Sequence, residues 1–241
     1  MARNSLEKDK IFRQIGETTI KAILKGWNKT GFLVRVTTKI SDSQGSLLVN
    51  MARTTVNFYL KNNDRIKPNN FFLSQFQEKK GVFVTLKKHF DSDNDLRGCI
   101  GFINPDIPLA ESLIEAAISA AFSDPRFEPL TFQELDKVIF EVSVLTPPKI
   151  LKVSSPKNYV SKIKIGLDGL IISWKHGDGL LLPQVPIEQG WSVEEYLANA
   201  CMKAGAKPDI WLQTDTKIFT FQVEIFSEVL PEGSITRKNL V

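Results

Sequence analysis

The stretch Leu96-Arg97-Gly98-Cys99-Ile100-Gly101 decides the predicted fold, because it has the pattern of the second strand of a β-hairpin. The first strand is predicted over Val82–Leu86, and the turn-forming residues Asp91–Asp95 join the two strands. Glycine inside a strand usually marks a bulge or the close approach of a ligand or another backbone. The stretch also holds one of the two cysteines of the chain, so this hairpin bears on both the fold and the chemistry.

The residues on either side of the hairpin extend it into a larger α+β pattern. Apolar spacing and capping signals predict helices over 47–61, 108–120 and 192–204. Alternating apolar residues and turn signals predict further strands over 138–144, 163–165, 170–174, 180–182 and 219–225. The order strands, helix, strand therefore occurs twice, over 82–146 and 163–226. We expect an α+β fold of mostly antiparallel sheet flanked by helices, with two subdomains and internal pseudo-symmetry.

The first 42 residues differ from the rest of the chain in charge. They hold nine Lys/Arg against four Asp/Glu, whereas the remainder holds 22 Lys/Arg against 23 Asp/Glu. We interpret residues 1–42 as a helix–strand extension, Ser41–Gly45 as a linker, and 43–241 as the main domain with subdomains 43–150 and 151–241. Nucleic acid is an unlikely partner, because the basic charge is confined to this extension.

Length and composition exclude several classes of protein. The chain of 241 residues, 42% hydrophobic and 24% charged, can bury a sizeable core. It has no apolar run of the roughly 20 residues that would span a bilayer, and no signal-peptide pattern, so we expect a cytoplasmic protein with no membrane partner. The two cysteines fit a reducing compartment, and the two histidines argue against a His-rich zinc site or Ser-His and Cys-His hydrolase chemistry. We expect no metal and no cofactor.

Arg97 and Cys99 are the candidate catalytic residues. In an extended strand they lie on one face, and Gly98 and Gly101 leave space beside the sulfur for a ligand. A nearby guanidinium favours the thiolate, which is the nucleophilic form of cysteine. The alternative is that Cys99 is a buried small hydrophobic residue, as we expect for Cys201 on its apolar helical face.

Three further residues are candidates for ligand binding. Asp124 and Arg126 flank a proline in a predicted loop, where they could hold the loop together or where Arg126 could recognise an anion near Cys99. Gln184 follows a predicted strand and could bring an amide into the same cleft; as the end of an ordinary strand it needs no function.

Several strings with the right order and spacing resemble the AMMECR domain family. They are GVFVTL (81–86), LRGCIGF (96–102), DPRF (124–127), EVSVLTPP (141–148), GLLLPQVP (179–186) and KAG (203–205) with Trp211. The resemblance covers about residues 45–240 and includes the family signature LRGCIG at Leu96–Gly101 without departure. It implies two subdomains, and it carries over no metal ligands. Because family members occur fused to or encoded near a Memo-type dioxygenase-like domain and a radical SAM protein, it also implies these as partners in a modification system.

The sequence leaves three hypotheses for function. The leading one is a cleft next to LRGCIG that binds a small molecule or peptide, with Cys99 as a reactive thiol and Arg97 as its anion partner. The second is a regulatory or protein-binding module in which LRGCIG is structural. The third is nucleic-acid binding through the basic N-terminal extension.

Overall fold

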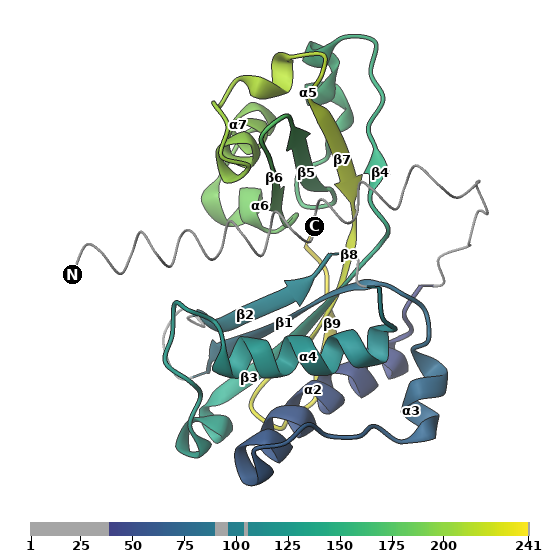
Figure 1. Cartoon of the computed structure of the whole chain (residues 1–241), viewed down its shortest axis with the longest axis vertical. Helices are drawn as coiled ribbons and strands as arrows, with labels where there is room; N and C mark the ends of the chain where they lie inside the picture. Colours follow the sequence, from purple (N-terminus) through teal and green to yellow (C-terminus); the bar gives the residue numbers. More distant parts are fainter. Residues whose placement is uncertain (1–38, 90–95, 104–105, 241) are drawn as a thin grey trace. The chain divides into compact units, whose positions relative to one another are not determined.

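The computed structural model describes residues 39–89, 96–103 and 106–240 (Figure 1). The predicted N-terminal extension up to residue 38 and the turn at 91–95 therefore lie outside the described residues. The described chain forms two units. We call them the five-strand unit, within Arg35–Leu145 and Glu224–Asn239, and the four-strand unit, Thr146–Val223.

The five-strand unit is built on a sheet with the strand order β2-β1-β3-β8-β9. Its strands are β1 (Gly81–Lys88), β2 (Leu96–Phe102), β3 (Val138–Leu145), β8 (Val223–Glu228) and β9 (Ile235–Lys238). The pairs β1–β2, β1–β3 and β8–β9 are antiparallel, which confirms the predicted hairpin and the predicted sheet type. The strand β2, which carries LRGCIG, lies at one edge of this sheet.

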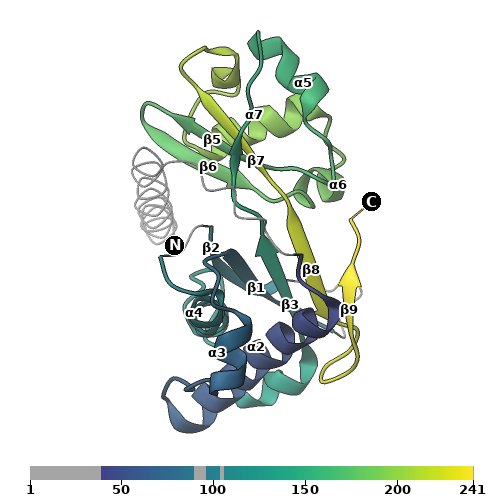
Figure 2. The same cartoon turned by 90° about the vertical axis from the view of Figure 1, so that its right-hand side faces the viewer.

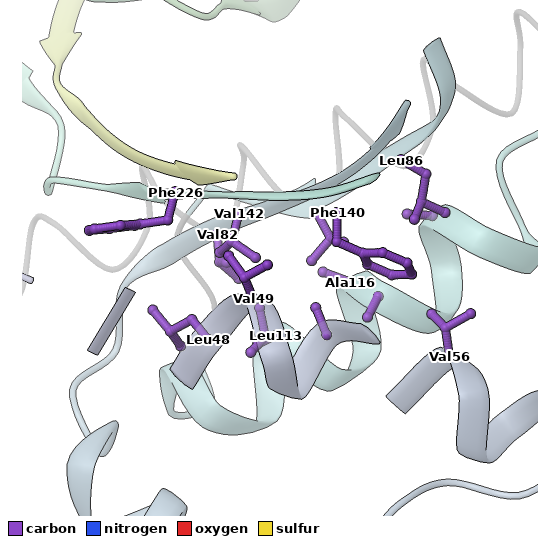
Figure 3. Close-up of a cluster of buried hydrophobic side chains, with 14 of the residues drawn as sticks. Leu48, Val49, Val56, Val82, Leu86, Leu113, Ala116, Phe140, Val142 and Phe226 are labelled. Atoms are coloured by element: carbon purple, nitrogen blue, oxygen red, sulfur yellow. The ribbon is translucent and has the colours of Figure 1, made fainter. Parts of the chain in front are cut away.

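Helices cover one face of the five-stranded sheet (Figure 2). They are α2 (Asp42–Asn62), α3 (Asn70–Gln75) and α4 (Leu109–Phe122), and a 3-10 helix, η1 (Phe132–Lys137), precedes β3. Alternate residues of β1 and β3, among them Val82, Val142 and Phe140, point toward α2 and α4 and form the core with Leu48 and Leu113 (Figure 3). The intervening residues of each strand must then point to the opposite face.

The start of α2 corrects the predicted linker at Ser41–Gly45. Ser41 is the N-cap, its side chain accepts a hydrogen bond from the Gln44 amide, and the Gln44 side chain accepts one from the Ser41 amide. This Ser-x-x-Gln arrangement is a capping box, so the turn-forming residues begin the helix rather than separate two domains. Gly45 lies within α2, and the ring of Phe226 occupies the space where its Cβ would lie, so packing explains the glycine.

The four-strand unit has the strand order β4-β7-β5-β6. Its strands are β4 (Lys149–Ile150), β5 (Gly169–Trp174), β6 (Gly177–Leu181) and β7 (Lys217–Phe221). Its helices are η2 (Pro156–Asn158), α5 (Tyr159–Lys162), α6 (Val185–Gln189), α7 (Val193–Lys203) and η3 (Ile210–Leu212). The predicted capping box is present at Ser192, and Cys201 of α7 is fully buried in the core, where burial raises the pKa of its thiol to about 11.

The same topology occurs in both units. A hairpin is followed by a helix that packs on it and by a third strand that pairs with the first hairpin strand: β1, β2, α4 and β3 in one unit, and β5, β6, α7 and β7 in the other. In each unit a glycine of the second hairpin strand contacts the C-terminal part of the helix. A Cβ on Gly98 would come well under 3.0 Å from the Ala120 carbonyl oxygen, and one on Gly179 equally close to the Ala204 nitrogen. The doubled pattern of the sequence is therefore a repeated topology.

The end of the chain differs from the single strand predicted over 219–225. The chain forms two strands there, β7 and β8, which belong to different sheets and are separated at Gln222. Residues 224–239 consequently return to the five-strand unit, which a division of the chain at residue 150 did not anticipate. The strand β9 was missed; Arg237 fixes it by binding Asp42 of α2 and Glu224 of β8.

Candidate functional site

The candidate site lies on the face of the five-stranded sheet opposite the helices. Ile100 and Phe102 of β2 pack against the helix-side core, so Cys99 projects from the other face. The strand register places Cys99 opposite Thr85 of β1, and Thr85 opposite Glu141 of β3. A row of polar side chains, Cys99, Thr85 and Glu141, therefore crosses three adjacent strands.

The surroundings of Cys99 do not activate its thiol. Cys99 as a residue is partly buried, and the Thr85 hydroxyl donates a hydrogen bond to its sulfur over 3.3 Å. Burial raises the pKa of the Cys99 thiol; the Thr85 hydrogen bond and the Arg126 charge lower it, while the carboxylates of Asp124 and Glu141 raise it further. The net shift of the Cys99 pKa is upward, in contrast to the lowered pKa expected from the sequence, because desolvation of the thiolate outweighs the charge of Arg126.

Arg97 is engaged elsewhere. Its side chain is buried and binds Glu134 of η1 through two hydrogen bonds, Nε to Oε1 over 2.8 Å and Nη2 to Oε2 over 3.2 Å. The backbone amide and the hydroxyl of Thr131 also donate hydrogen bonds to the Glu134 carboxylate. The Arg97 hydrogen bond is the largest influence on the pKa of Glu134, which falls to about 2. The arginine that influences the Cys99 sulfur is thus Arg126 and not Arg97.

Asp124 and Arg126 cap the outer edge of β2 at Cys99. The Asp124 carboxylate accepts a hydrogen bond from the Cys99 amide over 2.9 Å, and Arg126 Nη2 donates one to the Cys99 carbonyl oxygen over 3.3 Å. The two side chains also bind each other, Nε to Oδ1 over 2.9 Å and Nη2 to Oδ2 over 2.6 Å. Their joint contacts replace the partner strand that an edge strand lacks.

The two members of this pair differ in exposure. The side chain of Asp124 is 1% exposed and that of Arg126 is 46% exposed. Burial opposes ionisation of Asp124, but the hydrogen bonds from Arg126 and from the Cys99 amide outweigh it and lower the pKa of the carboxyl group. Arg126 is therefore a guanidinium that is held in a fixed orientation on one side and open to solvent on the other.

The glycines of LRGCIG contact the protein itself. The Cβ position of Gly98 is taken by the backbone of Ala120 in α4, and that of Gly101 by the Val82 carbonyl oxygen and by Phe83. The space at Gly98 is therefore filled by α4 on the helix-covered face, and the space at Gly101 is filled by β1. Packing is sufficient to explain why both residues are glycines. Their predicted role in ligand binding is not needed to account for these contacts.

A cluster of charges on the same face was not identified from the sequence. Glu141 is 5% exposed and binds Lys87 of β1 over 3.1 Å and Lys238 of β9 over 2.8 Å. The sequence contained one signal of this cluster, which is the charged residue Glu141 among the apolar residues of a predicted strand. Its partners could not be assigned, because Lys238 belongs to a strand that was not predicted.

Gln184 belongs to the four-strand unit, where it is the residue before α6. Its side-chain oxygen is buried and has no hydrogen-bond partner among the residues that the structure describes. The grouping of Gln184 with Cys99 and Arg126 stays a prediction.

Throughout the described ranges, no three His, Cys, Asp or Glu side chains gather in a way that could hold a metal ion. None of the helices described here combines the length and hydrophobicity needed to cross a bilayer.

Comparison with known proteins agrees with this fold. The AMMECR1 family model matches residues 49–226. Protein MJ0810 of Methanocaldococcus jannaschii is 50% identical over 198 residues, which cover 82% of this chain and 96% of that protein. Protein MK0488 of Methanopyrus kandleri is 47% identical over 205 residues, which cover 84% and 97% of the two chains.

A solved structure is similar over the same range. The crystal structure of the uncharacterized protein PH0010 from Pyrococcus horikoshii matches with a TM-score of 0.79 and 48% identity, covering 84% of this chain and all of that one. The family match includes β2, with LRGCIG, and the Asp124–Arg126 pair. On the sequence match, the high identity and the shared fold, this chain belongs to the AMMECR1 family.

Proposed function

We propose that this chain is a binding module that recognises an anionic group of a small molecule or peptide at Arg126, on the face that carries Cys99. The observation that carries the proposal is the asymmetric Asp124–Arg126 pair. Its carboxylate is buried and fixed to the backbone of β2, and its guanidinium is half-exposed. A guanidinium held in a fixed geometry loses little conformational entropy on binding and suits carboxylate and phosphate groups.

In this proposal Cys99 is a contact residue and not a nucleophile. Its raised pKa leaves the thiol protonated at neutral pH, and the hydroxyl of Thr85 donates to the sulfur, so it supplies no base to remove the proton. The pairing of Arg97 with Glu134 and the packing of Gly98 support a structural role for much of LRGCIG. A peptide segment of a Memo-type or radical SAM partner remains part of the proposal as one source of the anionic group.

The test is a titration with acetate and with peptides that differ in having a free or an amidated carboxyl end, followed by NMR at the Cys99 amide. Arg126→Gln should weaken binding of the free carboxylate at least tenfold. The matched control is Arg65→Gln, because Arg65 is also paired with a carboxylate, that of Glu115, in the same unit. Cys99→Ala should change the affinity less than threefold.

Two results would contradict the proposal. One is unchanged carboxylate binding in the Arg126→Gln protein, which would show that the guanidinium has only the structural role of capping β2. The other is a covalent adduct on Cys99 whose formation is required for function, which would restore the reactive-thiol hypothesis.

A further inference from the structure

The cluster Lys87–Glu141–Lys238 contains more positive charge than its structural role requires. One lysine would be enough to neutralise the buried Glu141 carboxylate. The structure supplies two: Lys87 Nζ lies 3.1 Å from each carboxylate oxygen, and Lys238 Nζ lies 2.8 Å from Oε2. Glu141 is the ion-pair partner that the structure gives to both lysines within its described residues, so the cluster has a net charge of +1.

Both lysines remain accessible. The side chain of Lys87 is 24% exposed and that of Lys238 is 40% exposed, while that of Glu141 is 5% exposed. An ammonium group has three donors, and Glu141 does not use all of them on either lysine. The carboxylate thus fixes two ammonium groups close together, in the same way that Asp124 fixes Arg126.

The sheet sets the separation of the two cationic positions. Arg126 contacts the backbone of Cys99 on β2, and Glu141 lies two strands away on β3, with Thr85 of β1 between them. Neighbouring strands are about 4.8 Å apart, so β2, whose edge Arg126 contacts, and β3, which carries Glu141, are separated by roughly 10 Å. The side chains between them, Cys99 and Thr85, carry no charge at neutral pH.

We propose that Lys87 and Lys238 form a second anion subsite, and that the ligand is an elongated dianion with an anionic group at each end. One end binds Arg126, the other end binds the lysine pair, and an uncharged middle crosses Thr85. This inference rests on the proposed function, because it assigns the ligand class of the same binding face. Acidic peptides with a free carboxyl end and small dicarboxylates share this chemistry.

The probes are azelate and nonanoate, which have the same chain length and differ in one terminal carboxylate. Calorimetric titration of the full chain should give at least tenfold tighter binding for azelate. Lys87→Gln and Lys238→Gln should each bring azelate to within threefold of nonanoate and leave nonanoate unchanged. Lys88→Gln is the control, because it removes the same charge from the next residue of β1, which alternates to the other face.

The outcomes separate this inference from the proposed function. Equal affinity of the two probes, or azelate binding that is insensitive to both lysine substitutions, overturns the second subsite. If Arg126→Gln weakens both probes in that case, the Arg126 site itself stands. If Arg126→Gln affects neither probe, the proposed function fails. Far-UV circular dichroism and the urea midpoint confirm that each variant is folded.

Discussion

Replacing Gly98 by alanine tests whether the glycine of LRGCIG serves packing or a ligand. The added Cβ would lie 3.1 Å from the Ala120 carbonyl carbon and well under 3.0 Å from its oxygen. Both atoms are backbone atoms of a helix that is buried on β1 and β2, so the helix or the strand must shift. Overpacking of this kind costs about 1–3 kcal/mol, and alanine returns less than about 1 kcal/mol by restricting the unfolded chain. We therefore expect Gly98→Ala to lower the free energy of unfolding by about 1–2 kcal/mol.

The assay must report on the five-strand unit. The described tryptophans, Trp174, Trp191 and Trp211, all belong to the four-strand unit, so their fluorescence does not suit this purpose. Hydrogen exchange measured on peptides from β1, β2 and α4 reports local stability directly. Cys99→Ala is the control for a change on the same strand, and Gly179→Ala should produce the corresponding loss in the four-strand unit, detected by fluorescence.

A ligand role for Gly98 gives a different pattern. Exchange in β2 and α4 would then be unchanged within about 0.5 kcal/mol, which is the usual range for substitutions without a packing effect. Binding of the carboxylate probes would be lost at the same time. That combination would refute the packing explanation of the glycine.

Three further predictions concern charge and burial. Arg53→Met should destabilise the five-strand unit by about 3–5 kcal/mol in urea titration, because it leaves the Glu228 carboxylate, 1% exposed, without its ion pair; an effect below about 1 kcal/mol would contradict this. Pairing with Arg97 lowers the pKa of Glu134 from 4.5 to about 2, so the contribution of this pair to stability is present above pH 4.5 and is lost as the pH falls toward 2. The melting temperature of Glu134→Gln should therefore approach that of the wild type as the pH falls over this range. A constant difference between the two melting temperatures would contradict the pairing. Cys201, which is fully buried, should be alkylated only after unfolding, and mass spectrometry of the native protein at neutral pH checks this.

Local patterns predicted most elements of the fold, but the strand predicted over 163–165 was wrong, because the described chain forms no strand between α5 and β5. The alternation in β1 and β3 and the capping box at Ser192 depend on neighbouring residues, and the structure has each of them. The prediction of a linker at Ser41–Gly45 was wrong, because its turn-forming residues also suit a helix N-terminus. The break between β7 and β8 at Gln222 was missed, because the alternation of apolar and polar residues continues across it.

The site was less predictable, because its contacts join residues that are far apart in the chain. The alternation of side chains along the strand placed Arg97 and Cys99 on one face. In the structure the Arg97 guanidinium instead binds Glu134, which is 37 residues away in the chain. Lys238 reaches Glu141 across 97 residues through a strand that was not predicted. Asp124 and Arg126 were identified as candidates by residue type, and their position at the edge of β2 required the structure.

The measurement that tests the central claim most directly is the pH dependence of Cys99 alkylation in the folded protein. Iodoacetamide rates would be followed by peptide mapping from pH 6 to pH 10, with N-acetylcysteine as the reference. If the face around Arg126 binds ligands without an activated thiol, Cys99 should titrate above the usual thiol value of about 8.5 and should react more slowly than the reference at pH 7. A midpoint below that value, with faster alkylation than the reference, would contradict the account and assign Cys99 a nucleophilic role.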